Sequence, residues 1–206
     1  MAVSESVAGV VFAGGASSRM GRDKATLAVA GTLMAVRVAQ AMRAAGLSVF
    51  VVGGKRDSLV EAGLAFVDDR YPGDGPLGAI VTALGSTSDS ILVSSCDTPL
   101  LDEYAILALL ETARRLPRLD TVTSCTASSL EPLFAVYRQT ALAPLTDAFD
   151  GGVRSPRRAL QCLRWAACSQ PVPEVLLNVN TPADLVDAER RLSANGDTVE
   201  VASTNG

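Results

Sequence analysis

The sequence predicts an α/β fold with a doubly wound, mostly parallel sheet and helices on both of its faces. Short apolar segments of strand length alternate along the chain with segments of helical periodicity. The strand segments are apolar at nearly every position, as expected for strands that are covered on both faces of a parallel sheet. The chain has 206 residues, of which 48% are hydrophobic, and no linker rich in Pro, Gly and Ser. We therefore expect a single domain over residues 1–193.

In the first half of the chain, predicted strands and helices alternate regularly. The apolar run at 8–13 predicts a strand, and the periodic segment at 33–45 predicts a helix that ends at Gly46. Pro76 indicates the first turn of a later helix, where a missing N–H has no consequence. The expected strands are 8–13, 48–53, 64–68 and 90–95, and the expected helices are 33–45, 56–62 and 76–85.

In the second half of the chain, the alternation of predicted strands and helices is less regular. Residues 102–115 predict a long helix that Asp102 could cap. A final helix is expected from Thr181, with Pro182 at its first position and an acidic first turn. Residues 194–206 contain no periodic apolar pattern and predict a disordered tail. The other expected elements are strands at 120–125, 132–138 and 175–179, and helices at 140–149 and 155–163.

Composition and charge exclude several classes of partner. The net charge is -4, so nucleic acid and anionic membranes are poor partners. No apolar run is long enough to span a bilayer, and the first residues lack the basic and apolar regions of a signal peptide. We expect a cytoplasmic protein.

The residue types that are missing restrict the chemistry further. The chain has no histidine, which excludes Ser-His-Asp and Cys-His catalysis and HExxH zinc sites. Its four cysteines show no CxxC spacing, which argues against a zinc site and favours free, mostly buried thiols. Chemistry must therefore depend on carboxylates, amides, hydroxyls, Lys, Arg and a hard metal ion.

A glycine-rich, basic segment follows the first predicted strand. Residues 14–24 read GGASSRMGRDK, in which glycines let the backbone approach a ligand while Arg19, Arg22 and Lys24 supply positive charge. The spacing matches neither the Rossmann fingerprint, nor the P-loop, nor the nucleophile elbow. From the residues alone, this segment is either a phosphate-binding loop or a solvated turn with incidental charge.

The pattern G-G-x-S-x-R-M-G-x-D-K resembles the signature of the nucleotidyltransferases, most closely the molybdenum cofactor guanylyltransferases. Further blocks resemble this family in the same order and extend the resemblance over residues 9–192. They are DDRYPGDGPLGAI (68–80), SSCDTPLL (94–101), EPLFAVY (131–137), GVRSPRRAL (152–160) and NVNTPADL (178–185). The resemblance implies a Rossmann-like nucleotidyltransferase fold. It also implies Mg²⁺-dependent transfer of GMP from GTP to the terminal phosphate of molybdopterin, with release of pyrophosphate.

The resemblance also implies roles for individual residues. Asp97 would bind the metal, and Arg19, Lys24 and Asp97 would be the catalytic residues. The GTP-binding residues would be Phe12, Ala13, Gly14, Gly15, Lys24, Asp69, Gly75, Pro76, Leu77, Gly78 and Asp97. The acceptor-binding residues would be Arg154, Arg157, Asn178 and Asn180.

Ordinary structural roles compete with these assignments. Asp97 could cap the turn before the following proline, and Asn180 could cap the final helix. Asp69 could be a turn residue at a strand end. Residues 75–78 could simply start a helix, and 154–158 could be a solvated helix face.

Two positions depart from the family pattern. Phe12 replaces the usual small aliphatic residue, and Glu131 stands where many relatives carry histidine. We assign no function to Glu131 on the resemblance.

Other functions remain open at this point. They are a cytidylyltransferase for the same cofactor, a nucleotidyltransferase for another phosphate acceptor, and an inactive nucleotide-binding regulator. A NAD-dependent dehydrogenase lacks its glycine fingerprint here, and Gly14–Gly15 favours guanylyl transfer by resemblance. The expected partners are GTP, molybdopterin, and molybdoenzymes or their chaperones as recipients, with the protein acting as a monomer.

Overall fold

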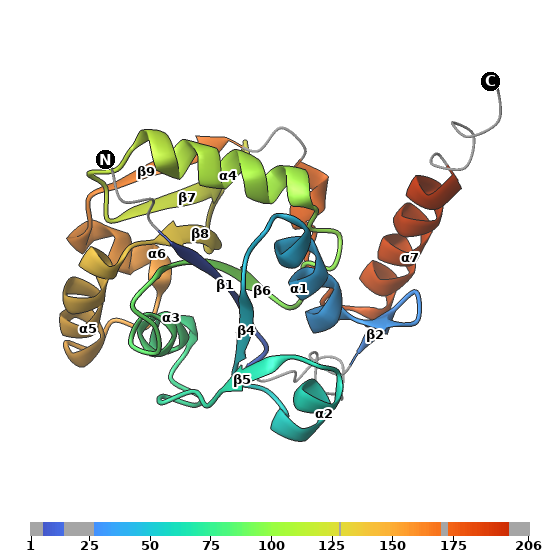
Figure 1. Ribbon diagram of the computed structural model, residues 1–206, viewed down its shortest axis with the longest axis horizontal. Helices are drawn as coiled ribbons and strands as arrows, with labels where there is room; N and C mark the ends of the chain where they lie inside the picture. Colours follow the sequence, from blue (N-terminus) through green and yellow to red (C-terminus); the bar gives the residue numbers. More distant parts are fainter. Residues whose placement is uncertain (1–5, 15–26, 128, 170–172, 198–206) are drawn as a thin grey trace.

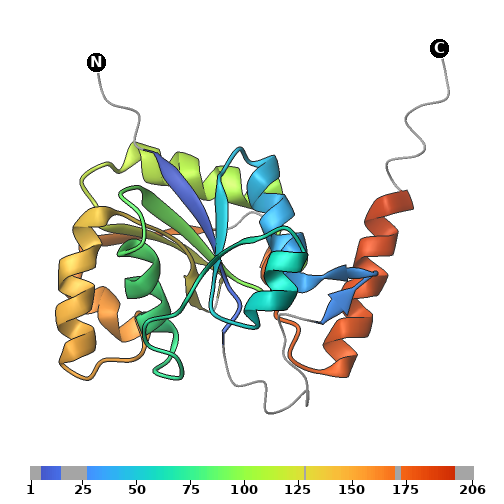
Figure 2. The ribbon, with the colours of Figure 1, turned by 60° about the horizontal axis from the view of Figure 1, so that its bottom comes forward.

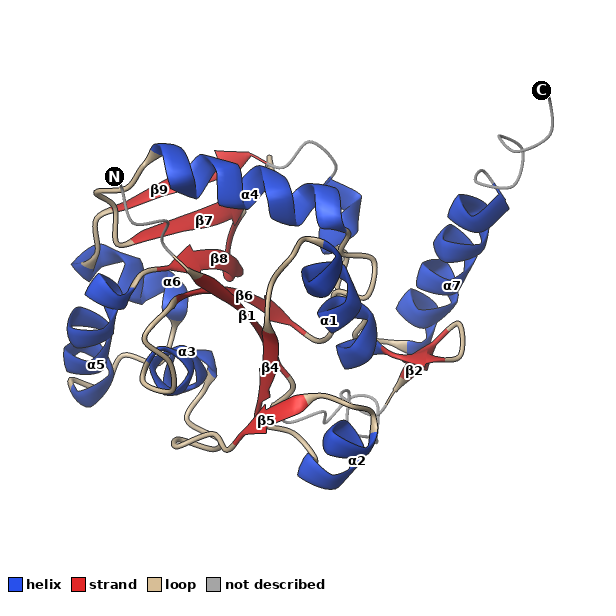
Figure 3. Cartoon of the chain, viewed as in Figure 1, coloured by secondary structure: helices blue, strands red, loops and turns tan. Residues whose placement is uncertain are grey.

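A seven-stranded sheet with the order β5-β4-β1-β6-β8-β7-β9 runs through the middle of the molecule (Figures 1 and 3). The computed structural model describes residues 6–14, 27–127, 129–169 and 173–197. The strands of the sheet are β1 (Val7–Phe12), β4 (Val49–Val52), β5 (Ala65–Val67), β6 (Ser90–Ser95), β7 (Thr121–Cys125), β8 (Leu130–Tyr137) and β9 (Trp165–Ser169).

Seven α-helices lie within the described residues. They are α1 (Met34–Ala44), α2 (Arg56–Glu61), α3 (Pro76–Leu84), α4 (Glu103–Arg115), α5 (Leu142–Asp150), α6 (Pro156–Ala159) and α7 (Pro182–Asp197). Short 3₁₀ turns are η2 (Gln139–Ala141), η3 (Leu160–Cys162) and η4 (Pro173–Leu176). None of the helices within the described ranges is both long and apolar enough to cross a bilayer.

The sheet is mostly parallel, which confirms the predicted fold class. Strand β1 pairs in parallel with β4 and β6, and β7 pairs in parallel with β9. Strand β8 is antiparallel to both of its neighbours, β6 and β7. The chain leaves β1 toward β4 and β5 and later returns to place β6 on the other side of β1. Ligands of open α/β sheets bind at such a reversal, outside the carboxyl ends of the strands.

Helices cover both faces of the sheet (Figures 1 and 2). Val11 of β1 packs in one core cluster with residues of α1 and α4, including Val38 and Leu109. The preceding residue, Val10, belongs to the opposite cluster, which includes Leu77 of α3 and Leu145 of α5. Because consecutive strand residues point to opposite faces, this division explains why the sequence of β1 is apolar at nearly every position.

Several helix boundaries follow the predicted signals. Gly46 takes a φ of 85° directly after the C-cap of α1, a conformation that glycine adopts without strain. The Asp102 side chain accepts a 2.9 Å hydrogen bond from the backbone N–H of Ala105 and caps α4. Pro76 and Pro182 begin α3 and α7 as expected.

The strand expected at 175–179 is wrong. The segment forms η4 and then an irregular stretch that leads to α7. Val175 and Leu176 pack onto the core from this turn, so their hydrophobicity reflects burial of a 3₁₀ turn and not sheet pairing. The strand at this edge of the sheet is instead β9, which no prediction covered because its exposed positions alternate with less exposed ones.

Other elements differ in detail. The expected helix at 155–163 divides into α6 and η3. A small hairpin of β2 (Ala28–Val29) and β3 (Thr32–Leu33) was not predicted, and α7 packs beside it (Figure 1). Helix α7 extends to Asp197, past the domain boundary expected at residue 193.

The four cysteines are free thiols, as expected. Cys96 and Cys168 are buried, while Cys125 is half-buried and Cys162 is exposed. The expectation that most of them are buried therefore holds for two of the four.

Asp120 joins three segments at the amino-terminal end of β7. Its carboxylate accepts hydrogen bonds from Arg164 N (2.8 Å), Nε (3.0 Å) and Nη2 (2.6 Å), and from the Thr140 hydroxyl (2.8 Å). The hydrogen bonds from the Arg164 side chain are the main reason that the pKa of Asp120 lies well below its usual value. This ion pair lies outside the cavity described below and has a structural role.

Candidate active site

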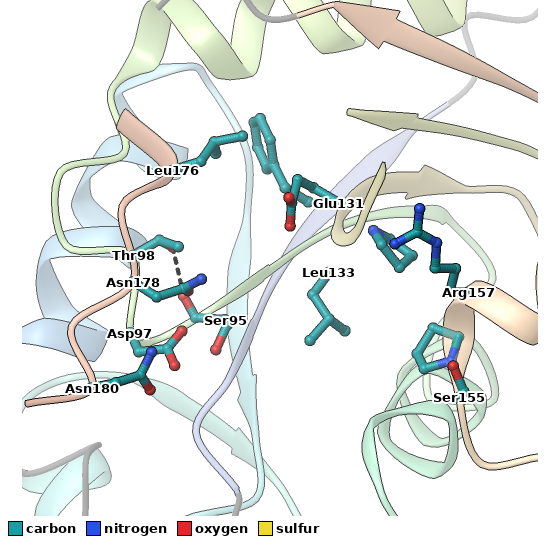
Figure 4. A pocket seen from close by; sticks show the side chains of 13 residues that line it. Ser95, Asp97, Thr98, Glu131, Leu133, Ser155, Arg157, Leu176, Asn178 and Asn180 are labelled. Atoms are coloured by element: carbon teal, nitrogen blue, oxygen red, sulfur yellow. Dashed lines mark hydrogen bonds between the residues drawn. The ribbon is translucent and has the colours of Figure 1, made fainter. Parts of the chain in front are cut away.

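A cavity of about 340 Å³ lies at the edge of the sheet where β6 ends and β8 begins (Figure 4). Because β8 is antiparallel to β6, the amino end of β8 and the carboxyl end of β6 meet at this edge. The cavity is lined by Ser95, Asp97, Thr98, Glu131, Pro132, Leu133, Phe134, Ser155, Pro156, Arg157, Leu176, Asn178 and Asn180.

Asp97 is fixed by the end of β6. The backbone N–H of Cys96 donates to the carbonyl of Phe12 over 3.0 Å, which extends the pairing between β1 and β6 to the residue before Asp97. The Thr98 hydroxyl then donates to the carbonyl of Ser95 over 2.9 Å and closes the turn (Figure 4). The half-buried carboxylate of Asp97 therefore lies at the cavity wall on a rigid support.

The segment with Asn178 and Asn180 is held directly against Asp97. The backbone N–H of Val179 donates a 2.8 Å hydrogen bond to the carbonyl of Asp97. The Val179 side chain is fully buried with Met34 and other apolar residues. With Val179 anchored, its two asparagine neighbours lie at the cavity (Figure 4). The sequence placed them on a strand, but an irregular segment brings them together instead.

Helix α7 begins at Pro182, so Thr181, and not Asn180, occupies the position directly before the helix. Thr181 and Asp184 form a reciprocal capping arrangement, in which the Asp184 N–H donates to the Thr181 hydroxyl (3.2 Å) and the Thr181 N–H donates to the Asp184 carboxylate (2.8 Å). The backbone N–H of Asn180 also donates to that carboxylate (2.9 Å) and is the largest cause of the lowered pKa of Asp184.

The opposite wall of the cavity comes from β8 and α6. Glu131 and Leu133 contribute from β8, and Arg157 contributes from the first turn of α6 (Figure 4). No function was assigned to Glu131 from the sequence. Its place at the cavity depends on the antiparallel pairing of β8, which the strand pattern alone does not predict.

A second group of predicted residues lies on the other side of β1. Phe12 and Ala13 are buried, so only their backbone is available to a ligand. Gly14 follows them in close contact with Gly53, the residue after β4, since a Cβ on Gly53 would lie 3.2 Å from the Gly14 Cα atom. Gly53 also has a φ of 73°, a value that favours glycine. No prediction covered Gly53, although two consecutive glycines after a strand, Gly53 and Gly54, are a sequence signal for such a close approach of the backbone.

Asp69 has a defined structural role at this side. Its Oδ1 atom accepts hydrogen bonds from the backbone N–H of Tyr71 (3.0 Å) and from the Thr82 hydroxyl (3.1 Å). This is the turn role that was considered for it. Asp69 nevertheless lies beside the glycines, because a Cβ on Gly53 would be 3.8 Å from the Asp69 Cβ atom.

Residues 75–78 start α3 and shape the surface near Asp69. Gly75 has a φ of 85° and a ψ of 176°, and Pro76 begins the helix. Leu77 is buried in the core, so its side chain is not available to a ligand. A Cβ on Gly78 would lie only 2.8 Å from the Tyr71 Cβ atom, so packing alone already requires glycine there.

Arg154 and Arg157 are separated by the fold. Arg157 lines the cavity, whereas Arg154 is not among the described residues that line it. The Arg154 guanidinium stacks over Phe149, 4.1 Å from the ring centroid, and donates to the Phe149 carbonyl over 2.6 Å. Its Nε atom lies 3.8 Å from an oxygen of Asp74, which places it beside Gly75.

Gly15, Arg19 and Lys24 lie outside the described residues. The described residues on either side of that segment are Gly14 and Leu27. Gly14 is at the carboxyl end of β1, and Leu27 packs against the cluster that contains Val179. Gly14 and Leu27 therefore each lie next to parts of the candidate site.

The donor atoms of the cavity suit a hard cation. Asp97 offers a carboxylate, and Asn178 and Asn180 offer amide oxygens. Within the described ranges, no group of three His, Cys, Asp or Glu residues could hold a metal ion. Mg²⁺ needs no such cluster, because it binds one or two protein carboxylates and completes its octahedron with waters and substrate phosphates. The residues present therefore fit Mg²⁺ held by Asp97 together with a bound phosphate.

Comparison with known proteins identifies the family of this chain. The MobA-like NTP transferase domain matches residues 9–167. A "Probable molybdenum cofactor guanylyltransferase" of Pelotomaculum thermopropionicum is 32% identical over 87% of this chain and 90% of its own length. The "Molybdenum cofactor guanylyltransferase" of Rhizobium meliloti is 31% identical over 87% of this chain and 89% of its own.

Solved structures show the same fold. Molybdopterin-guanine dinucleotide biosynthesis protein A from Archaeoglobus fulgidus superposes with a TM-score of 0.76 at 22% identity, over 90% of this chain and 98% of that one. A CMP:2-keto-3-deoxy-manno-octonic acid synthetase solved with CTP gives 0.71 at 17% identity, over 92% of this chain and 99% of that one. The family resemblance predicted from the sequence motifs is confirmed, and the chain belongs to the MobA-like NTP transferase family.

Proposed function

We propose that this protein transfers GMP from GTP to the terminal phosphate of molybdopterin and releases pyrophosphate. Relatives at about 30% identity over most of the chain carry the name molybdenum cofactor guanylyltransferase. The structural observation that carries the proposal is the hydrogen bond from Val179 N to Asp97 O, which holds the asparagine pair beside Asp97. This arrangement brings the carboxylate of Asp97 and the amides of Asn178 and Asn180 together in one cavity at the carboxyl end of β6, the strand next to β1.

The reaction needs positioning more than acid–base chemistry. An oxygen of the acceptor phosphate attacks the α-phosphorus of GTP in line, and the bond to the bridging oxygen of the leaving pyrophosphate breaks. The acceptor phosphate is already anionic near neutral pH, so no side chain has to remove a proton. The lack of histidine in the chain is consistent with this chemistry. Catalysis then comes from alignment and from neutralisation of the developing charge.

The nucleotide would lie across the carboxyl end of β1. Gly14 and Gly53 pack against each other there, with Asp69 beside Gly53, and their backbone would contact base and sugar. The segment from Gly75 to Gly78 would border the base through its backbone. We also propose that Gly15, Arg19 and Lys24 surround the triphosphate, with the two cations neutralising the leaving pyrophosphate.

Asp97 would hold Mg²⁺. The ion, when bound, supplies positive charge to the α-phosphate and to the leaving group. The contribution of the chain is to hold the Asp97 carboxylate rigidly, through the turn closed by Thr98 and the link to Val179.

The acceptor would occupy the 340 Å³ cavity. Asn178 and Asn180 would contact the acceptor near its phosphate, and Arg157 would contact it from the opposite wall. Arg154 lies beside Gly75, so it would reach the acceptor only where the acceptor meets the nucleotide. We further propose a cytoplasmic, monomeric enzyme whose product passes to molybdoenzymes or their chaperones.

Nucleotide selectivity tests the proposal. Pyrophosphate release is measured with GTP, CTP, ATP and UTP, each with Mg²⁺ and with or without molybdopterin. We expect release from GTP that depends on the acceptor, and little release from the other three. Release from CTP in place of GTP would overturn the guanylyl assignment and favour a cytidylyltransferase. A folded protein that binds GTP but releases no pyrophosphate with any nucleotide would favour a nucleotide-binding regulator.

A further inference from the structure

Strand β8 carries a bulge at the wall of the cavity. Its pairing with β7 shifts from Thr123↔Ala135 to Ser124↔Glu131, so that residues 132–134 of β8 stand opposite a single step of β7. The buried Tyr137 supports the bulge, because its hydroxyl donates a 2.8 Å hydrogen bond to the carbonyl of Pro132. Bulges of this kind change the direction of side chains and are common beside functional sites.

The bulge determines which side chains face the cavity. Glu131 and Leu133 both line it from β8, and Glu131 is only half-buried (Figure 4). Asp97 and Asn180 lie across the cavity from Glu131, and Leu176 approaches from the side of Asn178 (Figure 4). The cavity therefore has one end suited to a phosphate and its cation, and another that combines apolar surface with a carboxylate.

We infer that Glu131 binds the pterin ring of the acceptor through the amino-pyrimidine edge of that ring. The inference rests on the proposed function, since it concerns the same acceptor. A pterin presents its ring N3–H and its 2-amino group side by side, and a carboxylate can accept from both donors at once. The ring carbonyl next to N3–H is an acceptor that the guanidinium of Arg157 could bind.

The same geometry argues against Glu131 as a second metal ligand. Glu131 and Asp97 come from opposite walls of the cavity (Figure 4). Leu133 projects from the same strand as Glu131, and an apolar side chain beside the carboxylate suits the face of a flat ring better than a hydrated cation. The protein would thus recognise both ends of the acceptor, the phosphate near Asp97 and the ring near Glu131.

Binding measurements with two phosphate-free ligands test the inference without any need for turnover. Binding of 6-hydroxymethylpterin and of 6-hydroxymethyllumazine, which has a 2-oxo in place of the 2-amino group, is measured by ligand fluorescence. The wild type should prefer the pterin by about 10-fold or more. Glu131→Gln should weaken pterin binding about 10- to 100-fold and abolish the preference. Glu131→Asp should keep part of the preference, and Glu61→Gln, on the exposed end of α2, should behave like the wild type.

Turnover separates this inference from the proposed function. Glu131→Gln should raise the KM for molybdopterin and leave both the KM for GTP and the Mg²⁺ requirement unchanged. Unchanged pterin preference in Glu131→Gln, or a raised KM for GTP or raised Mg²⁺ requirement, would overturn the inference. A wild type that prefers the pterin but releases no pyrophosphate from any nucleotide would instead overturn the proposed function and leave the pterin site standing.

Discussion

The backbone N–H of Val179 donates a 2.8 Å hydrogen bond to the carbonyl oxygen of Asp97, although the two residues are far apart in sequence. Asp97 follows the central strand β6, and Val179 precedes α7. This bond connects Asp97, the proposed metal ligand, to the segment with Asn178 and Asn180, so the geometry of the candidate site depends on how well the 178–180 segment is anchored.

Val179→Ala tests that anchoring. The Val179 side chain is fully buried with Val29, Met34 and Ala188, and its truncation should lower the free energy of unfolding by about 1–2 kcal/mol. The KM for molybdopterin should rise because the asparagines lose their support. Urea unfolding and steady-state kinetics measure the two effects. Val60→Ala, at a position that is 52% exposed, is the control and should change stability by less than about 0.5 kcal/mol.

Asn180 and Thr181 are neighbours with separate roles. Asn180→Ala should reduce kcat/KM for the acceptor by about 10-fold or more, because a substrate contact is lost. Thr181→Ala should lower the free energy of unfolding by about 1 kcal/mol, because it removes the hydroxyl that caps α7. Thermal unfolding and acceptor titrations on both variants distinguish them. If Asn180→Ala lost stability while its kinetics stayed normal, the side chain would be structural and not part of the site.

Gly78→Ala tests the packing at the start of α3. A Cβ would stand 2.8 Å from the Tyr71 Cβ atom and 3.2 Å from the Phe149 ring, so the helix has to shift. We expect a loss of about 1–3 kcal/mol in the free energy of unfolding. Gly63→Ala is a useful comparison, since Gly63 has open space around it but a φ of 78°, and should lose only about 1 kcal/mol. Equal losses in the two variants would show that the close contact at Gly78 is easily relieved.

Asp120 should make stability depend on pH in acid. Its pKa is lowered in the folded state, mainly by hydrogen bonds from Arg164. The stability it contributes is therefore present above the unfolded-state pKa of about 3.9 and is lost as the pH falls below that value. Asp120→Asn should be less stable than the wild type at pH 7, and the difference should shrink between about pH 4 and pH 2. Urea unfolding across this range measures it, and a difference that stays constant would exclude the ion pair as its cause.

Much of the fold could be predicted from the sequence because most strands are buried on both faces. The apolar run at 8–13 marks β1 clearly, since its residues alternate between two helix-covered core clusters. The same rule failed at 175–179, where Val175 and Leu176 are apolar because a 3₁₀ turn packs on the core. It also missed β9, whose exposed positions alternate with less exposed ones at the sheet edge.

Some residues of the candidate site could be predicted from the sequence and others could not, because only some of them are placed by the parallel-strand pattern. Asp97 could be placed because side chains that follow a parallel strand lie at the ligand-binding edge of the sheet. Asn178 and Asn180 lie at the cavity as well, but through a hydrogen bond to Asp97 and not through a strand. Glu131 could not be found, since its position depends on the antiparallel pairing and the bulge of β8.

Turnover by Asp97→Asn tests the central claim most directly, with Asp57→Asn on the exposed surface of α2 as the matched control. The measurement is GTP-dependent pyrophosphate release with molybdopterin across a range of Mg²⁺ concentrations, on variants whose thermal unfolding matches that of the wild type. We predict that Asp97→Asn loses activity by about 100-fold or more, that Mg²⁺ restores little of it, and that Asp57→Asn is unaffected. Near-normal turnover by a folded Asp97→Asn protein would contradict the assignment of this cavity as the active site.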